Sequence, residues 1–440
     1  MADKKQARIV VLGGGFGGLS FAKHFWNPNA QVILVDRTNH HLFQPLLYQV
    51  ATAGLSAPDI AQPIRSILSQ HPNTTVLMDE VQDIDLANKI VVLGKQSLSY
   101  DYLIIALGSV TGYFGHNEWE QFAPGLKTLE DAFRIRRNIL LAFEKAETAK
   151  DAAELKRLMN IVVVGGGPTG VELAGAFSEL ARFVLNKDFD HIDPAQAKVM
   201  LIEAAPRVLA HMPAELSQSA LEQLQKLHVE VRTNTKVKNI SEKRVELEGG
   251  EVIEAENIVW AAGVAASPLT RKLAGVELDK GGRIKVNPDC SVPGHPEVFA
   301  IGDLAFLLHK DGRPVPGVSP AAMQMARHAA EIISDDLSLS FPKKPRPAFR
   351  YWDKGTMATI GRSKAVAYTG PIKMYGFIAW LAWLFVHLVF LVGFKSKVFV
   401  FLQWVYSYVT YRRGARIITN PTPPALAPDA KALAQPHAQK

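Results

Sequence analysis

The chain has 440 residues, of which 48% are hydrophobic and 21% are charged, so it is long enough for two or three globular domains. Its single cysteine, Cys290, excludes an intramolecular disulfide, a CxxC redox pair and a thiolate zinc site. The net charge is +7, but residues 395–440 alone carry seven lysines and arginines against one acid. The rest of the chain is almost neutral, which argues against a nucleic-acid partner and for an anionic partner near the C-terminal end.

The first residues imitate a secretion signal without completing one. A basic start leads into an apolar run, but glycines at 13 to 15 interrupt this run too early for a signal peptide. We therefore expect neither cleavage nor export.

Residues 9–36 predict a complete nucleotide-binding unit. An apolar strand is followed by Gly13, Gly15 and Gly18 in GxGxxG spacing, then by a helical pattern and a second apolar strand that ends in Asp36. The glycines permit a tight turn, close approach of a pyrophosphate and close helix packing, while the helix N-terminus favours negative phosphates. Asp36 is placed to accept hydrogen bonds from an adenosine ribose. A plain glycine-rich turn is the alternative.

The same unit returns at residues 161–203. Gly165, Gly167 and Gly170 repeat the spacing, and Glu203 ends the second strand. This duplication predicts a second dinucleotide fold. Glu203 follows Gly170 at a longer interval than usual, which we assign to an insertion around residues 183–194. A terminal acid instead of an arginine favours NADH over NADPH.

Other elements follow from the apolar periodicity and from helix start signals. In chain order we expect a helix beginning near residues 56–58, strands at 75–78, 89–93 and 101–108, a helix at 129–150, a helix at 221–227, and strands at 230–232, 243–247, 251–254 and 257–264. The strands at 101–108 and 257–264 each contain a glycine close to the C-terminal end, one in each half of the duplication.

Residues 297–305, EVFAIGDLA, place Gly302 and Asp303 directly after an apolar strand. Parallel sheets bind ligands at the carboxyl ends of their strands, so Asp303 is a candidate ligand contact. The alternative is that Asp303 caps the next helix.

The C-terminal region contains two apolar segments. Residues 375–393 have His387 as their only ionisable side chain, and a helix of this length would span roughly 28 Å, so a transmembrane helix is one interpretation. Residues 398–411 are apolar and aromatic except for Gln403, Ser407 and Thr410, which share one helical face, although β-branched residues leave a strand open.

Aromatic residues at 375–411 are followed by Arg412, Arg413 and Arg416. This combination favours a helix pair lying in an anionic membrane surface, so residues 375–416 are the expected membrane contact. A core helix of a C-terminal domain and a dimer interface are the alternatives. Residues 419–440, rich in Pro and Ala, are expected to be disordered.

These segments resemble the two-dinucleotide-binding-domain flavoproteins and, more closely, the type II NADH dehydrogenases, the single-subunit NADH:quinone oxidoreductases of bacterial respiratory chains. The match covers residue 8 to about residue 418. It is carried by VVLGGGFGGL, FQPLLYQVATAGLS, VVVGGGPTGVELAGA, EVFAIGDLA, YWDKGTMATIGR and the late WLFVHLVFLVGF and VFLQWVYSY segments.

We therefore expect an α/β fold of two Rossmann-like dinucleotide-binding domains, one inserted in the other, plus a C-terminal membrane-anchoring helical region. The expected boundaries are an FAD-binding domain at 1–118 and 281–340, a connecting helix at 119–157, an NADH-binding domain at 158–280, a C-terminal domain with amphipathic anchor helices at 341–418, and the tail at 419–440.

The resemblance implies FAD in the first unit and NADH in the second, with Asp303 at the ribityl–pyrophosphate portion of the flavin. The expected FAD residues are Gly13, Gly15, Gly18, Asp36, Thr52, Val81, Gly302 and Asp303. The expected NADH residues are Gly165, Gly167, Gly170, Glu203 and Gly263. No metal is implied.

Three more residues are candidates for tuning the reaction. Glu172 is expected to point from the first helical turn toward the nicotinamide, with a helix-dipole or capping acid as the alternative. Lys354 resembles a family lysine at the flavin N1/O2 edge, where a cation stabilises the anion formed on reduction; a solvated turn lysine is the alternative. Many relatives carry AQxxxQ, of which only Gln324 remains here because Pro320 replaces the first glutamine. Gln324 is expected at the quinone end.

The implied activity is hydride transfer from NADH to FAD, followed by transfer of two electrons to a membrane quinone such as ubiquinone, without proton pumping. The expected location is the cytoplasmic face of the inner membrane. A homodimer is a possible assembly, and the oligomeric state stays open. The alternatives are a soluble-type flavin reductase serving a small redox protein and a membrane-bound, non-catalytic redox sensor. Disulfide reductases and sulfide:quinone reductases need paired cysteines, which Cys290 alone does not supply.

Overall fold

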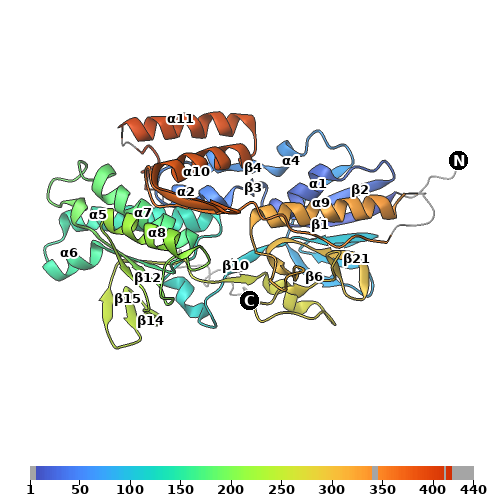
Figure 1. Cartoon of the computed structure of the whole chain (residues 1–440), viewed down its shortest axis with the longest axis horizontal. Coiled ribbons are helices and arrows are strands. Elements are labelled where there is room, and N and C mark those ends of the chain that lie inside the picture. The colour runs from blue at the N-terminus through green and yellow to red at the C-terminus, as the bar shows by residue number, and fades with distance from the viewer. Residues whose placement is uncertain (1–5, 339–344, 411–412, 419–440) are drawn as a thin grey trace, which may run out of the picture.

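The computed structural model describes residues 6–338, 345–410 and 413–418. The predicted disordered tail and Arg412 lie outside the described residues. Two α/β halves lie side by side, and the last two helices form a layer along one edge of the molecule (Figure 1).

The first half is built on a six-stranded sheet in which five neighbouring strands are parallel. The last four residues of its central strand β1 are completely buried, as expected for a parallel strand covered on both faces. Helices α1 (Phe16–His24) and α9 (Ser319–Asp336) pack against each other beside this sheet. The strand order is β20 (Ser291–Val292), β21 (His295–Ala300), β9 (Tyr102–Ile105), β1 (Ala7–Leu12), β2 (Ala30–Asp36) and β5 (Thr74–Met78).

The second half is built on a smaller, fully parallel sheet. Its strand order is β13 (Val229–Arg232), β12 (Lys198–Ile202), β11 (Asn160–Val164) and β17 (Asn257–Trp260). Its principal helices are α5 (Leu129–Thr148), α6 (Ala152–Leu158), α7 (Pro168–Glu179) and α8 (Ala214–Lys226). After α7 the chain forms a π-helical turn, Leu180–Val184, and a loop before β12, where the insertion is predicted.

In the sequence, the strands of the second sheet fall between strands β9 and β21 of the first sheet. Strand β21 follows the second unit in sequence, yet it pairs in parallel with β9 of the first sheet. The two halves are joined by an antiparallel ribbon of β10 (Ser109–Thr111) and β18 (Val264–Ala266). This topology agrees with one dinucleotide fold inserted in another, while the expected domain boundaries stay a prediction.

Smaller sheets flank the two halves. They are β3 (His40–Leu42) with β4 (Ala61–Pro63); β6 (Val81–Asp85), β7 (Ile90–Leu93) and β8 (Ser97–Ser99); β14 (Val237–Ser241), β15 (Arg244–Leu247) and β16 (Val252–Glu254); and β19 (Ile284–Lys285) with β22 (Ala305–Phe306).

The helix expected to begin near residues 56–58 is much shorter than the pattern suggests. It begins with a capping box between Ser56 and Asp59, but α3 (Ala57–Ile60) ends after four residues. The chain then forms β4, because residues 61–63 pair with β3, and only one further turn, α4 (Ile64–Ile67), follows. A tertiary pairing thus overrides the local helical pattern.

The C-terminal region consists of an antiparallel sheet and two helices. The elements are β23 (Thr356–Thr359), β24 (Ala365–Thr369), β25 (Ile372–Tyr375), α10 (Gly376–Phe390) and α11 (Phe394–Thr410). The strand interpretation of residues 398–411 is wrong, since all of these residues that are described are helical. Within the described ranges, no helix combines the length and the apolar character needed to cross a bilayer.

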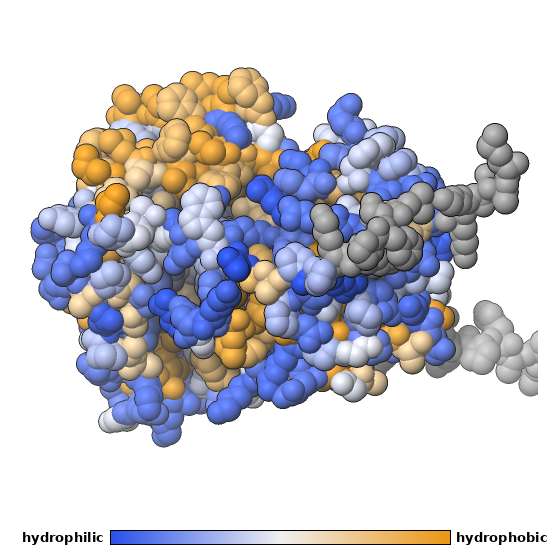
Figure 2. All heavy atoms as spheres, turned by 45° about the vertical axis from the view of Figure 1, so that its right-hand side comes forward, coloured by the Kyte–Doolittle hydropathy of each residue, from blue (hydrophilic) through white to orange (hydrophobic). Residues whose placement is uncertain are grey.

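Both last helices are apolar on the side that faces away from the protein. Their inner side chains, including Trp380, Trp383 and Trp404, belong to the main hydrophobic core. Figure 2 shows hydrophobic residues gathered at the top of the view, where α10 and α11 lie. We define the apolar face as the exposed residues Phe377, Ile378, Leu381, Phe385, Phe394, Phe399, Phe401, Leu402, Val405 and Val409.

Candidate functional site

The first glycine-rich loop lies between β1 and α1 and forms a cradle with space for a ligand. Gly13 has φ +100°, and a Cβ there would lie 2.4 Å from the carbonyl oxygen of Ala106. A Cβ on Gly18 would lie 1.8 Å from the oxygen of Gly13, so neither position accepts another residue. A Cβ on Gly15, by contrast, would meet nothing within 4 Å. This open position at a helix N-terminus fits a pyrophosphate.

The second loop, between β11 and α7, repeats this geometry. Gly165 has φ +113°, and its Cβ would lie 2.6 Å from the nitrogen of Ala262. A Cβ on Gly170 would lie 1.8 Å from the oxygen of Gly165, and a Cβ on Gly167 would meet nothing within 4 Å. The chain therefore has two cradles of the same construction, each suited to the phosphates of a dinucleotide.

The acid that ends each second strand is bound to its own loop. Asp36 Oδ2 accepts a hydrogen bond of 2.6 Å from Gly14 N, and Oδ1 accepts two of 2.7 Å from the N–H and hydroxyl of Thr38. Glu203 likewise accepts from Gly166 N. Both acids are thus fixed beside a cradle, and their contact with a ribose stays a prediction.

Asp303 lies in a three-residue 3₁₀ turn, Gly302–Leu304, where Gly302 has φ +75°. Its carboxylate accepts a hydrogen bond of 2.7 Å from Ser109 Oγ, and Lys127 Nζ donates to the same hydroxyl at 3.1 Å. The capping interpretation is wrong, because the residue before α9 is Val318 and Asp303 does not begin that helix.

Sequence reasoning missed Ser109 and Lys127. Burial lowers the pKa of Lys127, and the charge of Asp303 opposes this effect. Ser109 belongs to the ribbon between the halves and Lys127 precedes α5, so the group ties the connecting segments to the expected flavin site. No spacing or motif in the sequence indicates this hydrogen-bonded group of Ser109, Lys127 and Asp303, because Asp303 lies far from the other two residues in sequence.

Three of the other expected cofactor residues have structural contacts of their own. Thr52 is buried, and its hydroxyl donates to the oxygen of Tyr48 at 2.9 Å. Val81 begins β6 and pairs with Leu93. Gly263 has φ +79°, and a Cβ there would lie 2.7 Å from Phe114. Their roles toward FAD or NADH stay predictions.

Glu172 lies beyond the first turn of α7, which contains no acidic residue, so its expected place in the first turn and the capping interpretation are wrong. Its orientation toward the nicotinamide stays a prediction. Its Oε1 accepts from Thr359 N of β23 at 3.4 Å. Burial raises the pKa of Glu172 to about 8, and the N–H group of Thr359 lowers it only in part. At neutral pH this carboxyl group is therefore largely protonated, and it faces the C-terminal region.

Gln324 and Lys354 both contact Trp352, Gln324 through its backbone and Lys354 through its ring. The amide of Gln324 donates to Trp352 O at 3.0 Å and accepts from Trp352 N at 2.9 Å. Lys354 is exposed, and its Nζ lies 5.0 Å from the ring centre of Trp352 and 5.5 Å from that of Phe390 in α10. Lys354 therefore packs on aromatic rings beside the end of α10, and its role toward a flavin stays a prediction.

The C-terminal helices are tied to α2 (Leu47–Ala51), which precedes Thr52. Trp404 Nε1 donates to the side chain of Gln49 at 2.9 Å, and Gln49 donates to the hydroxyl of Tyr48 at 2.8 Å. Burial raises the pKa of Tyr48 well above its usual value, and the charge of Glu172 adds to this rise. These contacts link α11 to α2, which follows the first cradle in the sequence.

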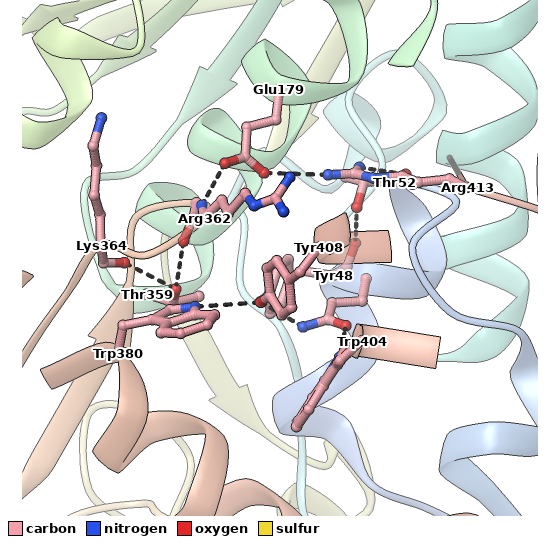
Figure 3. Close-up of polar contacts among 12 residues, drawn as sticks. Tyr48, Thr52, Glu179, Thr359, Arg362, Lys364, Trp380, Trp404, Tyr408 and Arg413 are labelled. Carbon is pink, nitrogen blue, oxygen red and sulfur yellow. Dashed lines mark hydrogen bonds and ion pairs between the residues drawn. The ribbon is translucent and has the colours of Figure 1, made fainter. Parts of the chain in front are cut away.

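A second tie is the ion pair between Arg413 and Glu179, drawn in Figure 3. The two groups lie 3.2 Å apart, and both side chains are largely buried. Arg413 also donates to Thr52 O at 2.9 Å, and Arg416 pairs with Asp188. Both arginines therefore pair with acids of the protein body, and their expected contact with an anionic membrane surface stays a prediction.

Replacing Arg413 with Ala is expected to lower the free energy of unfolding by about 3 kcal/mol, because the buried Glu179 would lose its ion pair with Arg413 and keep only weaker compensation, such as the hydrogen bond from Arg362 N. Urea unfolding of the detergent-purified protein measures this loss. Lys236, whose ion pair with Glu248 is exposed, provides the matched control, and K236A should change the value by less than about 1 kcal/mol. Equal stabilities of R413A and K236A would contradict a structural role for the buried pair.

Comparisons with known proteins agree with this geometry. The family model described as pyridine nucleotide-disulphide oxidoreductase matches residues 7–329. The type II NADH:quinone oxidoreductase Ndh of Mycobacterium tuberculosis is 44% identical over 427 residues, which cover 94% of this chain and 91% of that protein. The type II NADH:quinone oxidoreductase of Haemophilus influenzae is 30% identical, with 81% and 86% covered.

Among solved structures, NDH2 of Plasmodium falciparum in complex with NADH has the same fold. The TM-score is 0.86 at 22% sequence identity, and the match covers 93% of this chain and 99% of that one. The two cradles, the family model and the full-length relatives lead to one conclusion. The chain belongs to the pyridine nucleotide-disulphide oxidoreductase family and, within it, to the type II NADH:quinone oxidoreductases.

Proposed function

We propose that this protein is a membrane-associated flavoenzyme that oxidises NADH and reduces a quinone. The observation that carries this proposal is the pair of equivalent cradles, joined by the ribbon of β10 and β18, in a chain 44% identical to a type II NADH:quinone oxidoreductase. One cradle suits a resident dinucleotide and the other a dinucleotide substrate.

FAD would be held by the first cradle, with Asp303 at its ribityl–pyrophosphate portion, and NADH by the second cradle with Glu203. When bound, FAD supplies the capacity to accept a hydride and to release two electrons one step later. The chain itself supplies orientation. Ser109 and Lys127 hold Asp303 in place, and the short ribbon between the halves keeps the two cradles at a fixed separation.

Glu172 would supply a proton near the acceptor. Its pKa of about 8 leaves the carboxyl group protonated at neutral pH, and it lies between the second cradle and α10. Reduction of a quinone to a quinol consumes two protons, so a protonated acid on the side of the apolar helices suits that step.

The apolar face would place the protein on a lipid surface, where a quinone is dissolved. Large exposed apolar patches rimmed by polar residues mark membrane or protein contacts, and the aromatic content favours the membrane interface. We propose the cytoplasmic side of the inner membrane as the place of this contact. A homodimer through the same face is the competing use of these residues.

Purification in detergent, a flavin absorption spectrum and NADH oxidation with and without a soluble quinone test the proposal together. We expect a flavin spectrum and NADH oxidation that depends on the quinone. Quinone-independent transfer to a small redox protein would favour a flavin reductase. An intact flavin spectrum without NADH turnover would favour a redox sensor.

Replacing Lys354 with Met should slow NADH-dependent flavin reduction by about tenfold or more, since a cation near the flavin would stabilise the reduced anion. Rapid-mixing absorbance measures the rate, and the FAD content should stay at the wild-type level. K354R retains a cation and serves as the matched variant. Wild-type kinetics in K354M would remove Lys354 from the mechanism.

A further inference from the structure

In the first cradle, the backbone carbonyl of Gly14, between Gly13 and Gly15, accepts a hydrogen bond from a side chain. His41 of β3 places Nδ1 2.9 Å from the oxygen of Gly14. A carbonyl oxygen only accepts, so Nδ1 carries a proton. His41 is 2% exposed, and burial lowers its pKa, so the ring is neutral and its Nε2 is unprotonated.

Two contacts hold His41 in place. The backbone of His41 pairs with Gln62 in the antiparallel contact of β3 with β4. The ring of Phe16, a residue of the same glycine-rich segment, meets the imidazole edge to face at 5.1 Å between ring centres. Among the described residues Nε2 has no hydrogen-bond partner, so the contact with Gly14 is the one polar tie recorded for this ring.

The second cradle keeps the same acceptor but uses a different donor. The oxygen of Gly166 accepts from the backbone N–H of Leu209 at 2.7 Å. Leu209 has φ +48°, a conformation that costs energy for a branched residue and that persists only where the surroundings impose it. Two unrelated segments therefore place an N–H on the equivalent carbonyl, which indicates that the orientation of this peptide matters in both halves.

The geometry of a trans peptide explains why. In a planar trans peptide the C=O and the following N–H point in opposite directions. When the carbonyl of Gly14 is drawn toward His41, the N–H of Gly15 is aimed away from His41. Gly15 is exposed, and a Cβ there would meet nothing within 4 Å, so the surroundings of Gly15 leave room for a ligand.

We propose that His41 is a positioning residue for the dinucleotide in the first cradle: it turns the peptide between Gly14 and Gly15 so that the Gly15 N–H is presented to the pyrophosphate. The identity of that dinucleotide as FAD rests on the function proposed above. Leu209 performs the same task for the second cradle, but through its backbone, so a side-chain substitution leaves that donor in place.

The test compares donor-free and donor-retaining variants of the full-length, detergent-purified protein. His41→Phe and His41→Leu remove the donor at two different volumes, and His41→Asn keeps an N–H close to the position of Nδ1. His40→Phe, at the neighbouring solvent-facing position, is the matched control. Dilution of the holoenzyme, followed by the fluorescence of released flavin, gives the dissociation constant of FAD. Quenching of tryptophan fluorescence by NADH gives the affinity of the second cradle.

We expect FAD to bind about tenfold more weakly to H41F and H41L, the loss of one buried hydrogen bond. H41N should stay within about threefold of the wild type, and H40F and all NADH affinities should be unchanged. Wild-type FAD affinity in either donor-free variant, or affinity in H41N as weak as in H41F, would overturn the inference. A wild-type protein that binds no FAD would instead refute the proposed function.

Discussion

Replacing Glu172 with Gln should lower quinone-dependent turnover at pH 7 by about a hundredfold, the usual effect of removing a proton donor. The wild-type rate should fall about tenfold per pH unit above the pKa of about 8, and the E172Q rate should not depend on pH in this range. Steady-state NADH:quinone assays from pH 6 to pH 9.5 measure both effects.

The same pKa predicts a dependence of stability on pH. The pKa of Glu172 in the folded protein lies above the ordinary value of 4.5, so the stability that the neutral carboxyl contributes is complete below about pH 4.5 and is lost as the pH rises through about 8. E172Q, whose amide stays neutral, should therefore become more stable relative to the wild type over this interval.

Glu222 is exposed on α8, and E222Q provides a matched acid-to-amide control that should behave like the wild type. Flavin reduction by NADH in a single turnover should be nearly unchanged in E172Q, because the proton is needed by the acceptor. If E172Q retains the wild-type activity and pH profile, Glu172 is a structural acid.

The second large effect is expected at the apolar face. Replacing Phe399 and Leu402 together with Glu should weaken binding to lipid vesicles by about a hundredfold, because two exposed apolar side chains are lost and two charges are added at the interface. Sedimentation with vesicles of phosphatidylcholine and phosphatidylglycerol measures the bound fraction. The apolar core behind this face should be unaffected.

Val252 of β16 is also apolar and 51% exposed. Strand β16 pairs with β15, which lies away from α10 and α11 in Figure 1, so V252E is the matched control. Undiminished vesicle binding by the double variant would show that this face does not contact the membrane. A dimeric wild type that becomes monomeric in the double variant, with vesicle binding retained, would assign the face to a protein interface.

Local constraints explain why the two cradles could be predicted from sequence. The positive φ of Gly13 belongs to the turn itself, and the limit at Gly18 comes from Gly13 and Val11 in the same strand and turn; the contact of Gly13 with Ala106 adds a constraint from a distant segment. The spacing of three glycines is therefore sufficient to predict the loop. The insertion of one fold in the other was expected from the resemblance to the two-dinucleotide-binding-domain flavoproteins, and the pairing of β21 with β9 agrees with it.

Features that depend on contacts between distant segments could not be predicted in the same way. Ser109 and Lys127 meet Asp303 only through the folded chain. Arg413 belongs to a run of basic residues that suggested a membrane surface, yet it pairs with Glu179 of α7. Local charge does not reveal which cations the fold itself neutralises.

Helix ends illustrate the same difference. The start of α3 near residues 56–58 was expected correctly, since helix start signals are local, and the structure forms a capping box there between Ser56 and Asp59. Its end depends on the pairing of residues 61–63 with β3, and this pairing has no periodic signal. Glu172 was assigned to the first turn of α7 from its distance to Gly170, but the helix begins earlier, at Pro168.

The position of β21 in the first sheet has a consequence for the synthesis of the protein. This strand, His295–Ala300, pairs with β9 only after the whole second unit has been translated. The second sheet, within residues 160–260, can close earlier, because all four of its strands leave the ribosome before β21 does. We therefore expect the half that begins the chain to be completed last, with its long-range pairing as the slow step of folding.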